Sequence, residues 1–144
     1  MKVVVQRVKE ASCKVDGKIT GEIKNGLMLL VGFTYGDNLD TINKMIQKIV
    51  NLRIFDDENG IMNKSVLDTG GSILSISQFT LYADTKKGNR PSYIEAMKGE
   101  EATLLYDLFN NELSKLIHVE TGVFGADMDI SLINSGPTTI ILER

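Results

Sequence analysis

Near its end, the chain places a proline where the flanking residues predict β-structure. Residues 128–133 and 139–142 read as two closing strands, and Gly136-Pro137 lies between them. Proline cannot donate a hydrogen bond to a neighbouring strand, and glycine reaches backbone angles that other residues avoid. The strand pattern must therefore be interrupted here, and a tight hairpin turn is the simplest interpretation. Only about 5–6% of bonds preceding proline are cis, so the sequence alone does not fix the isomer.

The rest of the chain predicts further strands with helices between them. Strand-like patterns cover residues 3–8, 27–33, 53–55 and 72–82, and Asp16-Gly17 predicts a hairpin between residues 13–15 and 18–20. Apolar residues recur at helical spacing over residues 39–49, after a cap at Asp37 or Asn38. The helical pattern returns from Ser92. We predict an α+β fold of mostly antiparallel strands with a few helices, in which residues 1–144 form one compact domain.

The second helical segment carries an apolar stripe that we expect to face the core. The stripe comprises Leu104, Leu105, Leu108, Phe109, Leu113 and Leu116.

Composition argues against several classes of protein. Sixteen basic against nineteen acidic residues give a net charge of −3, which does not suit a surface that coats nucleic acid broadly but permits a local basic patch. The single cysteine, Cys13, rules out an intrachain disulfide and suits a reducing compartment. No segment approaches the roughly 18 consecutive apolar residues of a membrane span, and the N-terminus lacks a signal-peptide pattern. We expect a cytoplasmic protein with no membrane partner.

The residue types that usually carry catalysis are scarce. The only histidine, His118, follows the second helical segment, where a surface residue is commoner than a catalytic base. One histidine and one cysteine do not suffice for a zinc site, and the acidic run at residues 56–58 lacks the spacing of a calcium loop. We expect no metal and no cofactor. Catalysis, if present, must use backbone groups, hydroxyls or the substrate itself.

The segment Ser77-Gln78-Phe79-Thr80 ends a long apolar strand pattern in polar side chains. In a strand, Gln78 and Thr80 would lie on one face, with Ser77 and Phe79 on the other. Strand ends commonly present such groups to a pocket. Taken alone, the segment is equally typical of an edge strand that turns its polar side chains to solvent.

Several segments together resemble the D-aminoacyl-tRNA (D-tyrosyl-tRNA) deacylase family. They are VVVQRV, NLRIFDDENG, GGSILSISQFTLYADTKKGNRPSY, VETGVFGADM and NSGPTT, which match the family in order and spacing over nearly the whole chain. The resemblance implies a hydrolase that cleaves the ester between a D-amino acid and the 3′ adenosine of tRNA. It also implies a homodimer with active sites at the subunit interface.

The resemblance further implies how the enantiomers are told apart. Gly136-Pro137 would be cis and enter the pocket of the other subunit, where its carbonyls hold the substrate amino group and leave no room for an L side chain. Glycyl-tRNA, which has no side chain to clash, would be poorly rejected. Met128 would line the adenosine pocket, and Arg7 would support the Gly-Pro segment. Ser135 and Thr138 stand where the family commonly carries an acidic residue and valine.

An aminoacyl ester is already activated, and the neighbouring ribose 2′-hydroxyl can assist the attack of water. The protein then needs mainly to position the ester and to stabilise negative charge. We assign these roles to Gln78, Phe79 and Thr80, with Ser77 binding substrate. The rival hypothesis makes Thr80 a covalent nucleophile, although no histidine or lysine is evidently placed to activate it.

Partners and alternatives follow from the same segments. Lys86, Lys87 and Arg90 lie in one polar loop and are candidates for contact with tRNA phosphates, or form a solvated charged loop. A related activity, with Gly136-Pro137 trans, would admit a small L-amino acid. A non-catalytic dimeric RNA-binding or replication-associated module on the same fold is the third possibility. We expect no DNA partner.

Overall fold

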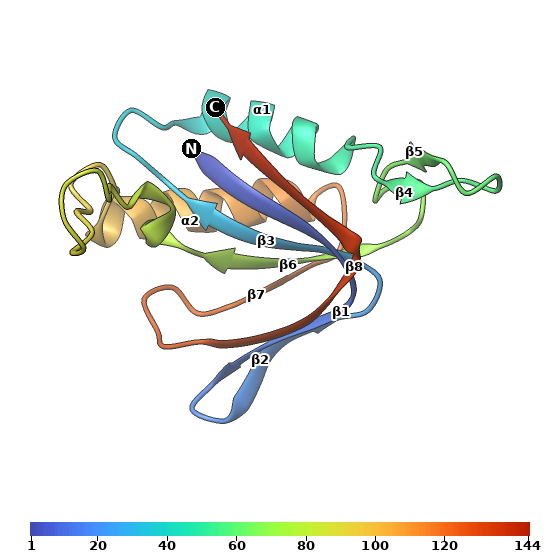
Figure 1. Ribbon diagram of the computed structural model, residues 1–144, viewed down its shortest axis with the longest axis horizontal. Coiled ribbons are helices and arrows are strands. Elements are labelled where there is room, and N and C mark those ends of the chain that lie inside the picture. The colour runs from blue at the N-terminus through green and yellow to red at the C-terminus, as the bar shows by residue number, and fades with distance from the viewer.

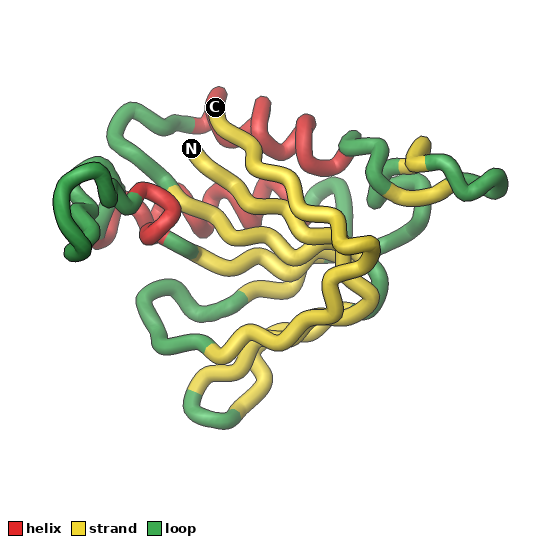
Figure 2. The backbone as a smooth tube through the Cα atoms, viewed as in Figure 1, coloured by secondary structure: helices red, strands yellow, loops and turns green.

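The computed structural model describes residues 1–144 as eight strands, two α-helices and one short 3-10 helix (Figures 1 and 2). None of the helices is long and apolar enough to cross a membrane. The strands are β1 (Lys2–Val15), β2 (Lys18–Ile23), β3 (Gly26–Gly32), β4 (Phe55–Asp56), β5 (Met62–Lys64), β6 (Ser72–Ser77), β7 (Val119–Thr121) and β8 (Asp129–Glu143). The helices are α1 (Leu39–Val50), η1 (Phe79–Tyr82) and α2 (Gly99–Ser114).

Six strands form one mixed sheet in the order β2-β1-β3-β6-β7, with β8 on the other edge of β1. The pairs β1–β2, β1–β3 and β1–β8 are antiparallel, whereas β3–β6 and β6–β7 are parallel. The parallel pairs arise because α1 lies between β3 and β6 and α2 between β6 and β7, and parallel neighbours need such crossovers. The predicted α+β class is confirmed, with a parallel part that the sequence patterns did not indicate.

The sheet curls into a barrel-like shape around the long strand β1. The first half of β1 pairs with β3 and the second half with β2, while β8 follows β1 along almost its whole length (Figure 1). The two ends of the sheet approach each other, since a Cβ added to Gly21 of β2 would lie 2.8 Å from the Thr121 carbonyl oxygen of β7. The outer edge of β8 pairs with no strand.

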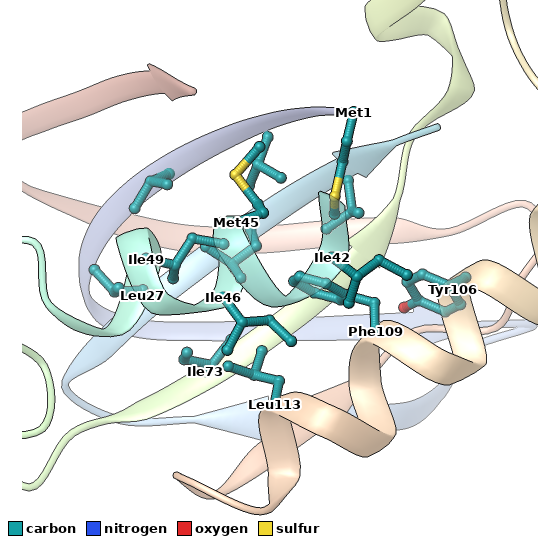
Figure 3. Packing of buried hydrophobic residues seen from close by; sticks show 14 of the residues in the cluster. Met1, Leu27, Ile42, Met45, Ile46, Ile49, Ile73, Tyr106, Phe109 and Leu113 are labelled. Carbon is teal, nitrogen blue, oxygen red and sulfur yellow. The ribbon is translucent and has the colours of Figure 1, made fainter. Parts of the chain in front are cut away.

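Alternation along the strands separates two cores. One face of β1, β3 and β6 packs against both helices, and Figure 3 shows Ile73 of the sheet beside Ile46 of α1 and Leu113 of α2. The other face turns into the barrel, where Cys13 is fully buried beside Met28 and Leu74. Cys13 thus serves as a small packing residue.

The first helix forms as its sequence predicts. Asn38 is the cap, because its Oδ1 accepts hydrogen bonds from the backbone N–H groups of Asp40 (2.9 Å) and Thr41 (3.2 Å). Asp37 instead accepts a 2.8 Å bond from the Thr34 N–H.

Several predictions of local structure are wrong. The strand expected over residues 72–82 ends at Ser77, because its partner β3 ends at Gly32 and the chain turns into η1. The helix expected from Ser92 begins at Gly99, since backbone bonds between Ser92 and Asp84 hold the preceding segment as a loop. Of the expected apolar stripe, Leu104 of α2 and Leu116 beyond the end of α2 are exposed, whereas Ala102 and Tyr106 of α2 are buried in the core.

The Gly136-Pro137 segment is not a hairpin. Both flanking halves belong to β8 and pair with the one strand β1, so the chain runs on in the same direction. Asn134 lies opposite Val8 and Thr139 opposite Gln6, so the four residues between them on β8 face only Arg7 on β1. The surplus residues form a bulge, in which Gly136 and Pro137 are exposed.

Candidate active site

The carboxyl ends of the parallel strands meet at one edge of the sheet and enclose a cavity of about 310 Å³. Val31 and Gly32 end β3, and Ile76 and Ser77 end β6. The segment after β7 and the start of α2 complete the lining. The contributing residues are Val31, Gly32, Ile76, Ser77, Gln78, Phe79, Met97, Ala102, Phe124, Gly125, Ala126, Asp127, Met128 and Ile130. Ser77, Gln78, Phe79 and Met128 are thus brought together, as the sequence predicted for a pocket.

Gln78 and η1 form one wall of this cavity. The Gln78 N–H donates to the Val31 carbonyl at 2.7 Å, and the Leu81 N–H donates back to the Gln78 carbonyl at 3.3 Å. Gly32 lies directly beneath, and a Cβ at this position would be 2.9 Å from the Gln78 carbonyl oxygen. The absence of a side chain at Gly32 therefore sets how closely η1 approaches the sheet.

Replacing Gly32 with alanine is expected to displace η1 while the rest of the fold remains. A displacement of about 1 Å at a catalytic site can reduce a rate by about 100-fold, and we expect a loss of that order in kcat/KM for the reaction that the resemblance implies. Circular dichroism would verify the fold. Unchanged activity in a folded variant would show that η1 is not part of the catalytic wall.

The floor of the cavity continues into the barrel core. Met128 packs against the cluster that contains Cys13 and Ile76. A Cβ on Gly122 would lie only 2.5 Å from the Met128 Sδ, so glycine leaves the room that this side chain occupies. Gly122 donates its N–H to the Ser75 carbonyl at 3.0 Å, and the Tyr106 hydroxyl donates to the same oxygen at 2.7 Å. Burial raises the pKa of Tyr106, so the phenol stays protonated as the donor that this bond needs.

An aromatic pair and a basic loop lie next to η1. The half-exposed ring of Phe79 contacts the ring of Tyr93 edge-to-face, with centroids 5.1 Å apart. The loop that holds the three predicted tRNA contacts is closed by reciprocal backbone bonds between Asp84 and Ser92, of 2.8 and 2.9 Å. Lys86, Lys87 and Arg90 are all exposed and form no salt bridge, which leaves their charges available.

Thr80 does not line the cavity, and its hydroxyl forms no hydrogen bond with a histidine or a lysine. The Gln78 side-chain amide donates to Thr80 Oγ1 at 2.5 Å. The two residues contact each other at the start of η1, and not on one face of a strand as the sequence predicted. His118 is exposed and contacts Glu120 at 2.9 Å. No group of three or more His, Cys, Asp or Glu side chains is arranged to hold a metal ion.

The second motif is held by side chains of β1 and β8. The Gly136–Pro137 peptide bond is cis. Arg7 donates from Nε to the Ser135 carbonyl at 3.1 Å and from Nη1 to the Ile54 carbonyl at 2.6 Å, and Nη1 lies 3.6 Å from a carboxylate oxygen of Asp56. Arg7 is therefore in contact with the residue that precedes Gly136.

Asn134 is a further support, which the sequence did not single out. Its amide donates to Gln6 Oε1 at 2.9 Å and to Thr139 Oγ1 at 3.0 Å, and its Oδ1 accepts the Thr138 N–H at 3.2 Å. Asn134 thus joins the two ends of the bulge. An asparagine just before a Gly-Pro pair, with a threonine just after it, is the signal that would have identified it.

Within one chain the two motifs lie far apart. Arg7, opposite the bulge, pairs with Leu27 of β3, whereas Ser77 pairs with Val31, four residues further along. At about 3.3 Å per residue and about 4.8 Å per strand, the bulge lies about 13 Å along the sheet and about 14 Å across it from Ser77. Gly136 and Pro137 therefore do not reach the cavity of their own chain.

Comparison with known proteins agrees with this geometry. A family model described as D-Tyr-tRNA(Tyr) deacylase matches residues 4–143. A solved structure named "c-Myc DNA Unwinding Element Binding Protein" is 41% identical with a TM-score of 0.95, over 100% of this chain and 99% of that one. A second, named "Structural Analysis of a probable eukaryotic D-amino acid tRNA deacylase", shares the fold at 16% identity and a TM-score of 0.83, over 98% and 97% of the two chains.

The family match, on this fold, thus defines a hydrolase that acts on the ester bond of D-aminoacyl-tRNA. The family match spans nearly all of the chain, well beyond the two motifs. The chain belongs to the D-Tyr-tRNA(Tyr) deacylase family.

Proposed function

We propose that the chain acts in the cytoplasm as a homodimeric chiral proofreading enzyme, in which each active site combines the cavity of one subunit with Gly136-Pro137 of the other. The observation that supports this is the separation of the two motifs within one chain. Gly136 and Pro137 are exposed on a bulge, and β8, which carries them, has an unpaired outer edge. A second copy of the chain can bring the bulge to a cavity that its own chain leaves out of reach.

The start of η1, which includes Phe79 in the cavity lining and the adjacent Thr80, supplies backbone donors for catalysis. The first hydrogen bond of η1 starts at the Leu81 N–H, so the N–H groups of Phe79 and Thr80 precede the bonded part of the helix. We assign these two groups to the oxyanion that forms when water attacks the ester, and the Gln78 side chain to positioning. The ribose 2′-hydroxyl assists the water, and no protein base is required.

The bulge supplies selection between enantiomers. The carbonyls of Gly136 and Pro137 hold the substrate amino group, and the D side chain points away from them. An L side chain would collide with the same backbone, so discrimination arises from exclusion. Ser77 and Met128 line the space for the terminal adenosine. Glycyl-tRNA carries no side chain to exclude and is expected to be hydrolysed as well.

Deacylation of matched D- and L-tyrosyl-tRNA in the presence of a chelator tests the proposal. Rapid release of D-tyrosine alone is expected. Release of neither amino acid would contradict catalysis, and equal release of both would contradict chiral selection.

Replacing Thr80 with alanine separates the two catalytic hypotheses. The backbone N–H remains in the variant, so we expect most of the activity to be kept. A covalent nucleophile, in contrast, would be lost completely. Single-turnover deacylation of D-tyrosyl-tRNA is the measurement, and a loss beyond about 1,000-fold would favour the nucleophile.

The basic loop is proposed to contact the acceptor end of the tRNA. Replacing Lys86, Lys87 and Arg90 together with alanine should weaken tRNA binding. The slope of log K against log salt should fall by about 0.7–0.9 for each phosphate that the variant no longer neutralises. A slope equal to that of the unaltered protein would contradict the proposal.

A nucleic-acid-binding role is the second candidate function. It is favoured by the 41% identical structure, which is named as a binding protein of a DNA unwinding element. Such a module would bind a duplex without turning over an ester. Tight, salt-sensitive binding of DNA by a protein that leaves D-tyrosyl-tRNA intact would select this alternative. Hydrolysis of D-tyrosyl-tRNA with weak DNA binding would exclude it.

A further inference from the structure

The outer face of α1 borders a basic groove away from the cavity described above. The groove has a volume of about 690 Å³ and extends from α1 to Arg53 and Arg144. Four cationic side chains line it, those of Lys44, Lys48, Arg53 and Arg144, together with amide side chains such as Gln47 and Asn51. No carboxylate side chain lines it.

This concentration of charge is local, because the whole chain carries a net charge of −3 with 16 basic residues. Four of those 16 cations lie in this one groove. Only Lys44 forms a salt bridge, with Asp40 at 2.6 Å, where both side chains are exposed. An exposed pair of this kind is weak and is readily exchanged for another anion. The groove thus suits a ligand with several regularly spaced negative charges.

The sequence of α1 explains the arrangement. Ile42, Met45, Ile46 and Ile49 face the core, so lysines four residues apart, Lys44 and Lys48, lie together on the solvent side. Gln47 and Asn51 form a neighbouring row of amides. Lysines and amides in adjacent rows are the side chains that commonly contact phosphate oxygens.

The groove is connected to the Gly-Pro bulge. Arg53 precedes Ile54, whose carbonyl accepts the 2.6 Å bond from Arg7, and Arg7 in turn donates to Ser135 beside Gly136. The carboxyl end of α1 and the bulge are therefore at the same end of the molecule. In the proposed homodimer, on which this step rests, the Arg53 end of the groove lies at the same end of its subunit as the bulge that enters the other subunit's cavity.

We propose that this groove binds the phosphate backbone of the tRNA whose aminoacylated 3′ end occupies the cavity of the partner subunit. Each tRNA would then contact both subunits. Its 3′ end would occupy the cavity of one subunit, and its helical stem would lie along the groove of the other. Phosphate contacts of this kind position the substrate and carry no sequence information, so the groove serves tRNAs irrespective of their amino acid.

The test replaces Lys44 and Lys48 with glutamine and compares the protein with a Lys14→Gln/Lys18→Gln control, which removes the same charge from the β1–β2 hairpin. The control lysines are exposed and form no salt bridge. Binding of uncharged tRNA is measured by fluorescence anisotropy across a salt series. The groove variant is expected to lose about 1.4–1.8 from the slope of log K against log salt, and the control nothing.

Kinetics with two substrates separate this inference from the proposed function. The groove variant should show a raised KM for D-tyrosyl-tRNA and an unchanged rate with D-tyrosyl-adenosine, which has no stem. A salt slope equal to that of the control would overturn the groove assignment even if D-tyrosyl-tRNA is hydrolysed normally. A protein inactive on both substrates would contradict the proposed function, while the anisotropy result would still decide on the groove.

Discussion

An equimolar mixture of two inactive variants, co-refolded as dimers, is expected to regain about a quarter of the unaltered activity. The first variant, Ala126→Trp, fills the cavity, which Ala126 lines. The second, Gly136→Ala, crowds the bulge, because Gly136 has a φ of +119° and a Cβ there would lie 2.8 Å from Arg7 Nη2 and from Thr138 Oγ1. Half of the dimers would be mixed, and one of their two sites would pair an unaltered cavity with an unaltered bulge.

The control is each variant refolded alone, which should remain inactive at any concentration. Size-exclusion chromatography of each variant establishes that it still forms dimers. Failure of the mixture to exceed the separate variants, with mixed dimers demonstrated, would mean that each site is built within one chain.

Replacing Arg7 with alanine is expected to reduce deacylation of D-tyrosyl-tRNA by about 100-fold, because Ser135 and the adjacent Gly136-Pro137 would no longer be held in place. The guanidinium contacts the Ser135 and Ile54 carbonyls and the Asp56 carboxylate, and its side chain is 13% exposed. Its loss leaves two carbonyls without their donor and should also lower the free energy of unfolding by about 1.5–3 kcal/mol. Activity at a temperature well below the unfolding transition separates the two effects.

Arg7→Lys is the informative companion to this variant. A lysine keeps the charge near Asp56 but cannot bond both carbonyls in the planar geometry of a guanidinium. It should therefore recover part of the stability and little of the activity. Full recovery of activity by lysine would show that charge, rather than the position of Ser135, is what Arg7 contributes.

Much of the fold could be predicted from local patterns. A helix cap at Asp37 or Asn38, the hairpin at Asp16-Gly17 and the strand through Leu29 follow from short-range chemistry, and the structure has all three, with Asn38 as the cap. The parallel pairing of β3 with β6 could not be predicted, because it depends on how the chain returns through α1. The apolar pattern correctly predicts a helix at α2 but wrongly assigns Leu104 to the core. Leu104 lies on the side of the helix that faces solvent.

The candidate site was predicted by motif and completed by geometry. Gln78, Phe79 and Met128 were expected at a pocket and do line one. Gly32 gave no sequence signal, because its importance depends on a contact between distant residues. A Cβ at this position would lie only 2.9 Å from the Gln78 carbonyl oxygen. The roles of Gly136 and Pro137 depend on a second chain, and no pattern within one chain encodes a distance to another.

The composition of the cavity wall determines how the enzyme can be damaged by mutation. Gly32, Ala102, Gly125 and Ala126 contribute main chain or a single methyl group to the lining, and the proposed donors are peptide N–H groups. A point mutation cannot remove a peptide N–H unless it introduces proline. Truncation to alanine, the usual way of mapping an active site, would therefore overlook much of this one. Inactivating mutations should instead be those that add volume, so a scan toward large side chains would outline the site most clearly.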